Sequence, residues 1–60
     1  MEATEFWTFE TWQEQMDGGY WSRDDCAWSS EYHAREAMMN DDPNKVHRLI
    51  RVIEIVEVLW

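Results

Sequence analysis

The side chains able to carry chemistry in this chain are few and scattered. Cys26 and His33 are a thiol and an imidazole seven positions apart, the residue types of a nucleophile and its base. Nucleophilic catalysis also needs an oxyanion site and a pocket for the substrate, and sixty residues leave little room for a pocket of a few hundred Å³. The sequence therefore predicts no catalytic residue, and we expect a protein that is not an enzyme.

Metal-ligating residue types are present without the spacing that metal sites use. They are Asp24, Asp25, Cys26, His33 and His47. No zinc-finger or H-x-x-x-H spacing relates them, and Asp41-Asp42 lacks the D-x-D-x-D-G loop of a calcium site. Gly18-Gly19 is typical of a turn and not of a phosphate-binding loop. The prediction is no metal and no cofactor.

Charge is the strongest compositional signal. Thirteen Asp and Glu face five Lys and Arg, for a net charge of −8, and eleven of the acids lie in residues 1–42. Such a field repels nucleic acid and anionic membranes and attracts basic surfaces, although acidity can also serve solubility alone. We expect a protein partner with a basic surface, such as a nucleic-acid-binding complex, with no direct binding of nucleic acid or membrane.

Three features bear on the compartment. Cys26 is the one cysteine, so an intrachain disulfide is impossible. The start, MEATEF, is acidic and lacks the apolar run of a signal peptide. The most apolar stretch, VIEIVEVLW, is too short and too charged to span a bilayer. We expect a cytoplasmic protein.

The pattern along residues 1–60 predicts one domain in the order strand, strand, helix, strand. Thr and aromatic residues favour a strand over residues 5–13, and Asp17-Gly18-Gly19 marks a turn, reached through a loop or bulge. A second strand is expected over residues 20–28, with a break at Asp24-Asp25 as the alternative. A helix is expected over residues 30–41, capped by Ser29 or Ser30, with a small-residue face that lies on the sheet.

Residues 46–58 are ambiguous. Seven Val and Ile in thirteen positions favour a strand, whereas Asp42-Pro43 is a good helix start. A straight strand of that length spans about 43 Å, so it needs a bulge near Val52-Ile53 or pairing with another chain. We favour the strand. The expected fold class is α+β, a small antiparallel sheet with one helix on one face.

Aromatic residues lie on both faces of the expected strands, and one helix covers one face. The uncovered rings are expected to form a partner-binding patch ringed by carboxylates, since Trp and Tyr are enriched at binding hot spots. Two alternatives stay open: the rings fill a core short of aliphatic residues, or a homodimer buries the second face. The predicted partner-binding residues are Trp7, Glu10, Trp12, Glu14, Asp17, Tyr20, Trp21, Asp24 and Asp25.

The segments EFWTFETW, SEYHAREAMMND and VHRLIRVIEIVEV together resemble small acidic phage-encoded host-takeover proteins in layout and composition. These include inhibitors of bacterial RNA polymerase and anti-CRISPR proteins. The resemblance implies a stoichiometric, non-enzymatic inhibitor in the host cytoplasm, which occupies a basic nucleic-acid site or locks a conformation of its target, and which can act as a nucleic-acid mimic. It assigns no residue by position. A self-associating structural or adaptor protein is the alternative.

Overall fold

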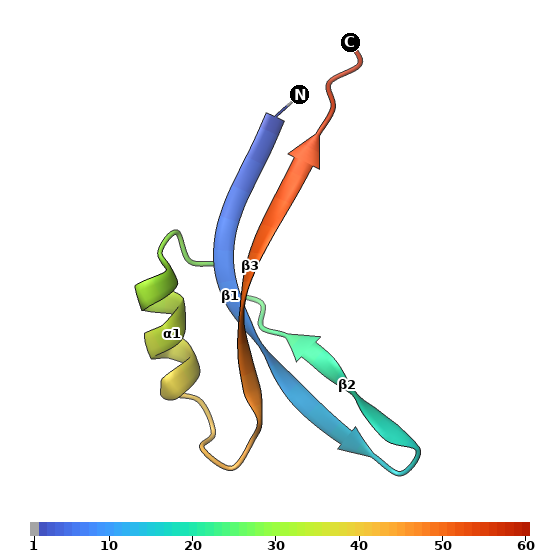
Figure 1. The fold of residues 1–60 in the computed structure, drawn as a ribbon, viewed down its shortest axis with the longest axis vertical. Helices are drawn as coiled ribbons and strands as arrows, with labels where there is room; N and C mark the ends of the chain where they lie inside the picture. Colours follow the sequence, from blue (N-terminus) through green and yellow to red (C-terminus); the bar gives the residue numbers. More distant parts are fainter. Residues whose placement is uncertain (1) are drawn as a thin grey trace.

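A computed structural model describes residues 2–60, which form one three-stranded antiparallel sheet and one helix (Figure 1). The elements are β1 (Glu2–Gln15), β2 (Gly18–Arg23), α1 (Glu31–Met39) and β3 (His47–Val56). The strand order is β2-β1-β3, so the longest strand lies in the centre. The predicted α+β class and the order strand, strand, helix, strand are confirmed.

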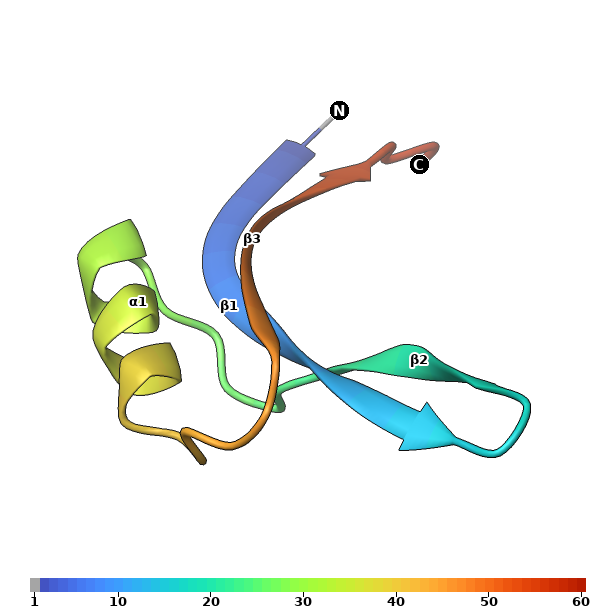
Figure 2. The same ribbon diagram turned by 60° about the horizontal axis from the view of Figure 1, so that its bottom comes forward.

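Strand β1 has its two partners at different ends. β3 pairs with residues 2–11 and β2 with residues 10–15, so only Glu10 and Thr11 are paired with both β2 and β3. The β1–β2 hairpin therefore extends from one end of the sheet and a two-stranded β1–β3 ribbon from the other (Figure 2). Beyond β2, Trp28 returns to the same edge of β1 and exchanges two backbone hydrogen bonds of 2.8 Å with Trp7.

The hairpin turn is tight. Gln15 pairs with Gly18, which leaves Met16 and Asp17 as a two-residue connection. The prediction of a longer loop or bulge is wrong, because β1 continues to Gln15. Gly18 has a φ of +120°, a conformation that L side chains rarely adopt. At Gly19 an added Cβ would lie 2.5 Å from the Trp12 indole, so the ring rests directly on the glycine backbone.

The second strand is shorter than predicted and ends at Arg23. The carboxylate of Asp24 accepts a hydrogen bond of 3.0 Å from the backbone N–H of Cys26, a local turn that takes the chain out of the ladder. Aspartate competes for backbone groups in this way, so the strand ends at the break that the sequence offered at Asp24-Asp25 and does not continue to residue 28.

Helix α1 begins after Ser30, which has the extended backbone of an N-cap residue, and Glu31 occupies the first turn. Ala34 is fully buried, and Ala37 and Met38 are half-buried, as predicted for a small-residue face on the sheet. The helix contacts β1 and β3 but not β2. The hairpin therefore extends past the cover that the helix provides.

The strand interpretation of residues 46–58 is confirmed by β3. Each residue from His47 to Val56 pairs in turn with β1, so no bulge interrupts the strand near Val52-Ile53. Its length is accommodated because β1 starts at Glu2, earlier than predicted. The far part of the ribbon has neither a third strand beside it nor a helix packed on it (Figure 1). The radius of gyration is accordingly 14.2 Å, against about 10 Å for a compact chain of this length.

The core is very small. Phe9 and Ala34 are the buried hydrophobic residues among those described, and Phe9 is the one buried aromatic residue. The Phe9 ring lies 5.9 Å from Trp28 and 5.7 Å from His47, between centroids. The hydroxyl of Thr8, also fully buried, donates a hydrogen bond of 2.7 Å to the Cys26 carbonyl. Phe9 of β1 thus contacts both the segment between β2 and α1, through Trp28, and the start of β3, through His47.

Phe9→Ala is expected to unfold most of the population. Removing a buried Phe costs about 3–5 kcal/mol, comparable with the whole stability of about 3–9 kcal/mol expected for sixty residues. Far-ultraviolet circular dichroism during urea unfolding measures the effect. Met16→Ala, a change at a fully exposed turn residue, is the control and should shift the midpoint little. A Phe9→Ala protein as stable as Met16→Ala would contradict this description of the core.

Candidate protein-binding face

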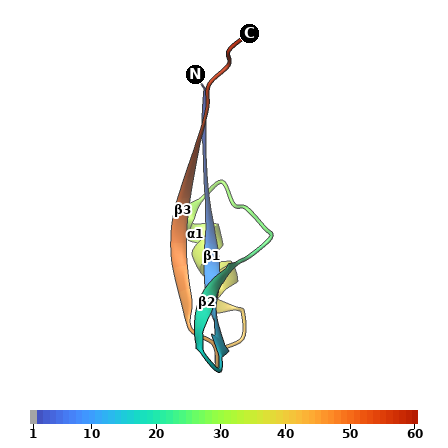
Figure 3. The same ribbon diagram turned by 90° about the vertical axis from the view of Figure 1, so that its right-hand side faces the viewer.

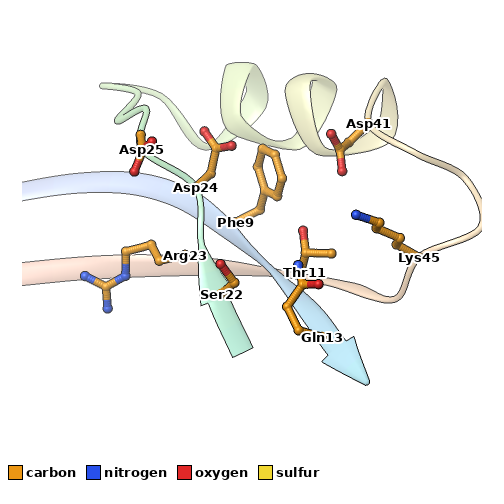
Figure 4. A pocket seen from close by; sticks show the side chains of 9 residues that line it. All are labelled: Phe9, Thr11, Gln13, Ser22, Arg23, Asp24, Asp25, Asp41 and Lys45. Carbon is orange, nitrogen blue, oxygen red and sulfur yellow. The ribbon is translucent and has the colours of Figure 1, made fainter. Parts of the chain in front are cut away.

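The alternation of β1 separates two sets of side chains. Phe9 points to the side of the sheet on which α1 lies (Figure 4). Glu10, Trp12 and Glu14 therefore lie on the opposite face, which the helix does not cover. Trp12 pairs directly with Trp21 of β2, and their rings meet edge to face with centroids 5.3 Å apart. We define the tryptophan face as Glu10, Trp12, Glu14, Trp21, Arg23 and Arg48.

An ion cluster joins the three strands at the centre of the tryptophan face. The Arg48 guanidinium of β3 lies 2.6 Å from Glu10 Oε1, and Arg23 Nε of β2 lies 3.6 Å from Oε2 of the same carboxylate. Glu10 is only 8% exposed. Its charge is thus neutralised within the sheet, and its part is to position the two arginines.

Each of the two indole rings also contacts a charged side chain. The Arg48 guanidinium carbon lies 4.1 Å from the centroid of a Trp21 ring, a cation–π contact. Trp12 Nε1 donates a hydrogen bond of 2.6 Å to the Glu14 carboxylate. Both rings remain half-exposed. A surface whose aromatic side chains are already ordered loses little side-chain entropy when it binds a partner.

The structure brings together four of the nine predicted partner-binding residues: Glu10, Trp12, Glu14 and Trp21. Trp7 lies on the opposite face, half-buried beside its partner Trp28. Tyr20 also faces that side, opposite Gln13, and is 51% exposed. The three remaining residues surround the hairpin: Asp17 in its turn, and Asp24 and Asp25 directly after β2.

Sequence reasoning missed Arg23 and Arg48 as members of this face. Arg48 binds Glu10, and Arg51 lies 3.6 Å from Glu5. Only the pairing register of β1 with β3 reveals this, and no local pattern encodes that register.

The helix side of the sheet holds an open pocket of about 210 Å³ (Figure 4). Asp24, Asp25, Asp41 and Lys45 are among its lining residues. Within residues 2–60, no three His, Cys, Asp or Glu side chains are close enough together to hold a metal ion. The pocket contains no nucleophile next to a base, and we assign it no chemistry.

Asp41, at the rim of this pocket, has a defined partner. Its carboxylate lies 2.7 Å from Nε2 of His47. This hydrogen bond holds the pKa of Asp41 below its usual value of 3.8. The contact links the segment after α1 to the start of β3.

Comparison with protein-family models, curated proteins and solved structures found no match to this chain. In the part of the chain that the structure describes, no helix is long and apolar enough to cross a membrane. The function of this protein is therefore inferred from the geometry and charge of its surface.

Replacement of Glu10 by Gln should destabilise the fold by about 1–2 kcal/mol. The carboxylate is mostly buried between two arginines, and hydrogen bonds to charged groups contribute about 1.5–3 kcal/mol, reduced here because Arg48 is half-exposed. Urea unfolding of Glu10→Gln, Arg48→Ala and the double variant measures the coupling. The exposed pair Glu31–Arg35 on α1 is the matched control, with an expected coupling of about 0.5 kcal/mol or less. Equal coupling free energies in the two pairs would show that the Glu10–Arg48 pair stabilises the fold no more than an exposed ion pair does.

The Asp41–His47 contact should make stability depend on pH in the acid range. Because the pKa of Asp41 is lower in the folded state, its contribution is complete above about pH 3.8 and is lost as the pH falls through the folded value. Asp41→Asn should therefore be less stable than the unmodified protein near about pH 6, with the difference shrinking as the pH falls below about 3.8. Urea midpoints measured across this range provide the test. A difference that persists unchanged at the lowest pH would rule out this contribution.

Proposed function

We propose that this chain is a non-enzymatic inhibitor that binds a basic, nucleic-acid-handling protein complex through the tryptophan face. The observation that carries the proposal is the pair Trp12–Trp21, half-exposed, ordered by Arg48 and Glu14, and left uncovered by the helix. Large rigid aromatic side chains in this setting are typical of binding hot spots.

The charge around the hairpin favours a basic partner. Residues 10–25 contain five carboxylates and one arginine. Glu10 is neutralised internally, so Glu14 and Asp17 supply the negative charge nearest the rings, while Asp24 and Asp25 add to the overall negative field from the helix side of the sheet. Exposed charges of this kind mainly accelerate and orient association, whereas the buried aromatic contacts supply affinity. Arg23 and Arg48 interrupt the acidic surface, which supports a mixed aromatic and ionic contact more than a pure imitation of a phosphate backbone.

The inhibitory role follows from the class of partner. Basic surfaces large enough to attract a chain of charge −8 belong mostly to proteins that bind nucleic acid, and a protein bound there competes with the nucleic acid. The resemblance in layout and composition to small acidic phage-encoded inhibitors supports the same role. The single exposed thiol, Cys26, is compatible with the reducing cytoplasm in which such an inhibitor acts.

The test is a capture experiment with matched variants. The tagged protein is mixed with bacterial lysate at about 0.05 M salt, and the retained proteins are eluted at about 0.5 M salt, where exposed charges are largely screened. We expect a nucleic-acid-binding complex to be retained by the unmodified protein and by Tyr32→Ala, a change at an exposed aromatic residue of α1. Trp21→Ala should reduce the retained amount at least about tenfold, since hot-spot residues contribute about 2 kcal/mol or more.

Competition identifies the site on the captured complex. An oligonucleotide that the complex binds should displace this chain if the two occupy one surface. Retention that is insensitive to Trp21→Ala, or a partner with no affinity for nucleic acid, would overturn the proposed function.

A further inference from the structure

The ribbon at the other end of the sheet leaves apolar side chains uncovered. Ile53, Ile55 and Val56 are 51%, 64% and 51% exposed. The accessible surface of the chain is 5040 Å², whereas a compact monomer of 7.3 kDa exposes about 4,200 Å². The surplus of roughly 800–900 Å² equals one partner's share of a standard protein interface, about 800 Å².

Strand β3 is an edge strand with free backbone groups. The backbone N–H of Trp12 bonds to the Val46 carbonyl, and the continuous register then directs the even-numbered residues of β3 toward β1. The odd-numbered residues of β1 correspondingly bond to the other side, as Trp7 does to Trp28. The N–H and C=O groups of β3 that point away from the sheet therefore belong to His47, Leu49, Arg51, Ile53 and Ile55. Figures 1 and 3 show no other segment along the ribbon part of this edge.

We propose that a second copy of this chain pairs antiparallel with the outer edge of β3, about a two-fold axis that passes beside Val52. The pairing joins two three-stranded sheets into one continuous sheet and keeps both tryptophan faces on the same side of it. The proposal does not depend on the partner proposed for the tryptophan face.

The side-chain alternation limits the possible registers. Two copies related by a two-fold axis perpendicular to the sheet keep the same face on the same side, so each residue meets a residue of the same parity. An axis at Arg51 or at Glu54 would place identical charges directly opposite each other, which is destabilising. Of the remaining central positions, Val52 gives the longer overlap within β3.

The register about Val52 also pairs chemically matched side chains. His47 of one copy lies opposite Glu57 of the other, Leu49 opposite Ile55, and Val46 opposite Val58. Arg48 lies diagonal to Glu54. Arg51 has the Arg51 of the second copy as a diagonal neighbour, and Glu5 of its own chain, at 3.6 Å, offsets that charge. The basic first half of β3 thus meets Glu54 of the second half and Glu57 just beyond the strand, and this charge complementarity favours another copy of the same strand at the edge.

Substitutions at Ile53 test the register by charge. Ile53 lies opposite Arg51 of the second copy in this register, so Ile53→Lys places like charges opposite each other twice by symmetry. We expect the dimer dissociation constant, measured by sedimentation equilibrium, to rise about three- to thirtyfold. Ile53→Glu places opposite charges there and should leave the dimer at least as strong. Within one chain Ile53 faces Glu5, so the Lys variant is the more stable monomer and loss of its dimer cannot be attributed to unfolding.

Cysteine cross-linking provides a second, independent readout. In a Cys26→Ser background, Val52→Cys should form a disulfide-linked dimer on mild oxidation, because the residue faces itself in a non-hydrogen-bonded pair with Cβ atoms about 4.5–5.5 Å apart. Ile53→Cys should cross-link much more slowly.

Three results would overturn the inference. A monomer at every concentration would do so, and so would a dimer weakened equally by Ile53→Lys and Ile53→Glu, which indicates an axis at Ile53. A dimer lost in Trp21→Ala but retained in Ile53→Lys would place self-association on the tryptophan face. Capture of a basic partner is measured with the same variants: Ile53→Lys should retain it and Trp21→Ala should lose it, so the two proposals fail separately.

Discussion

One helix of nine residues has to cover a sheet whose central strand has fourteen. The helix is about 13 Å long, whereas β1 spans about 46 Å when extended. Everything else in the architecture follows from this mismatch. Where α1 lies, Phe9 and Ala34 are buried and the chain has its core. Beyond α1, the hairpin and the ribbon extend with both of their faces accessible. The hairpin carries the tryptophan face, and the ribbon carries the β3 edge that is proposed to pair with a second copy.

Polar contacts take over where apolar burial is insufficient. Glu10 is placed where β2, β1 and β3 lie side by side, and its carboxylate meets one arginine from each outer strand. Such a buried carboxylate is costly unless it is paired, so the cluster favours one register of three strands over its neighbours. Thr8 acts similarly on the next even position, since its hydroxyl ties β1 to the Cys26 carbonyl. The sheet is thus specified partly by directional polar contacts.

The elements with strong local signals could be predicted from the sequence, and the contacts between them could not. Gly18-Gly19 marks the turn, Ser30 and Ala34 mark the start and the buried face of α1, and the Val and Ile of residues 46–58 indicate a strand. The limits of β1 were missed, because acidic residues at positions 2–5 act against simple strand propensity, whereas the Asp24-Asp25 pair had indicated where β2 could end. Within the tryptophan face, Glu10, Trp12, Glu14 and Trp21 belonged to the predicted partner-binding set. Arg48 could not be assigned to it, because its position depends on a pairing between residues far apart in the sequence.

The overlap of the two ladders at Glu10 and Thr11 has a consequence for how this protein can evolve. Only these two residues are paired with both β2 and β3, and both are buried. Beyond them the cation–π contact of Arg48 with Trp21 links β3 to the hairpin, and the backbones of β2 and β3 do not meet. Most substitutions near the end of the hairpin therefore leave the contacts of the far ribbon unchanged, and the reverse also holds. Selection can therefore alter one surface while the other is conserved, with the short shared segment as the fixed point between two independently varying halves.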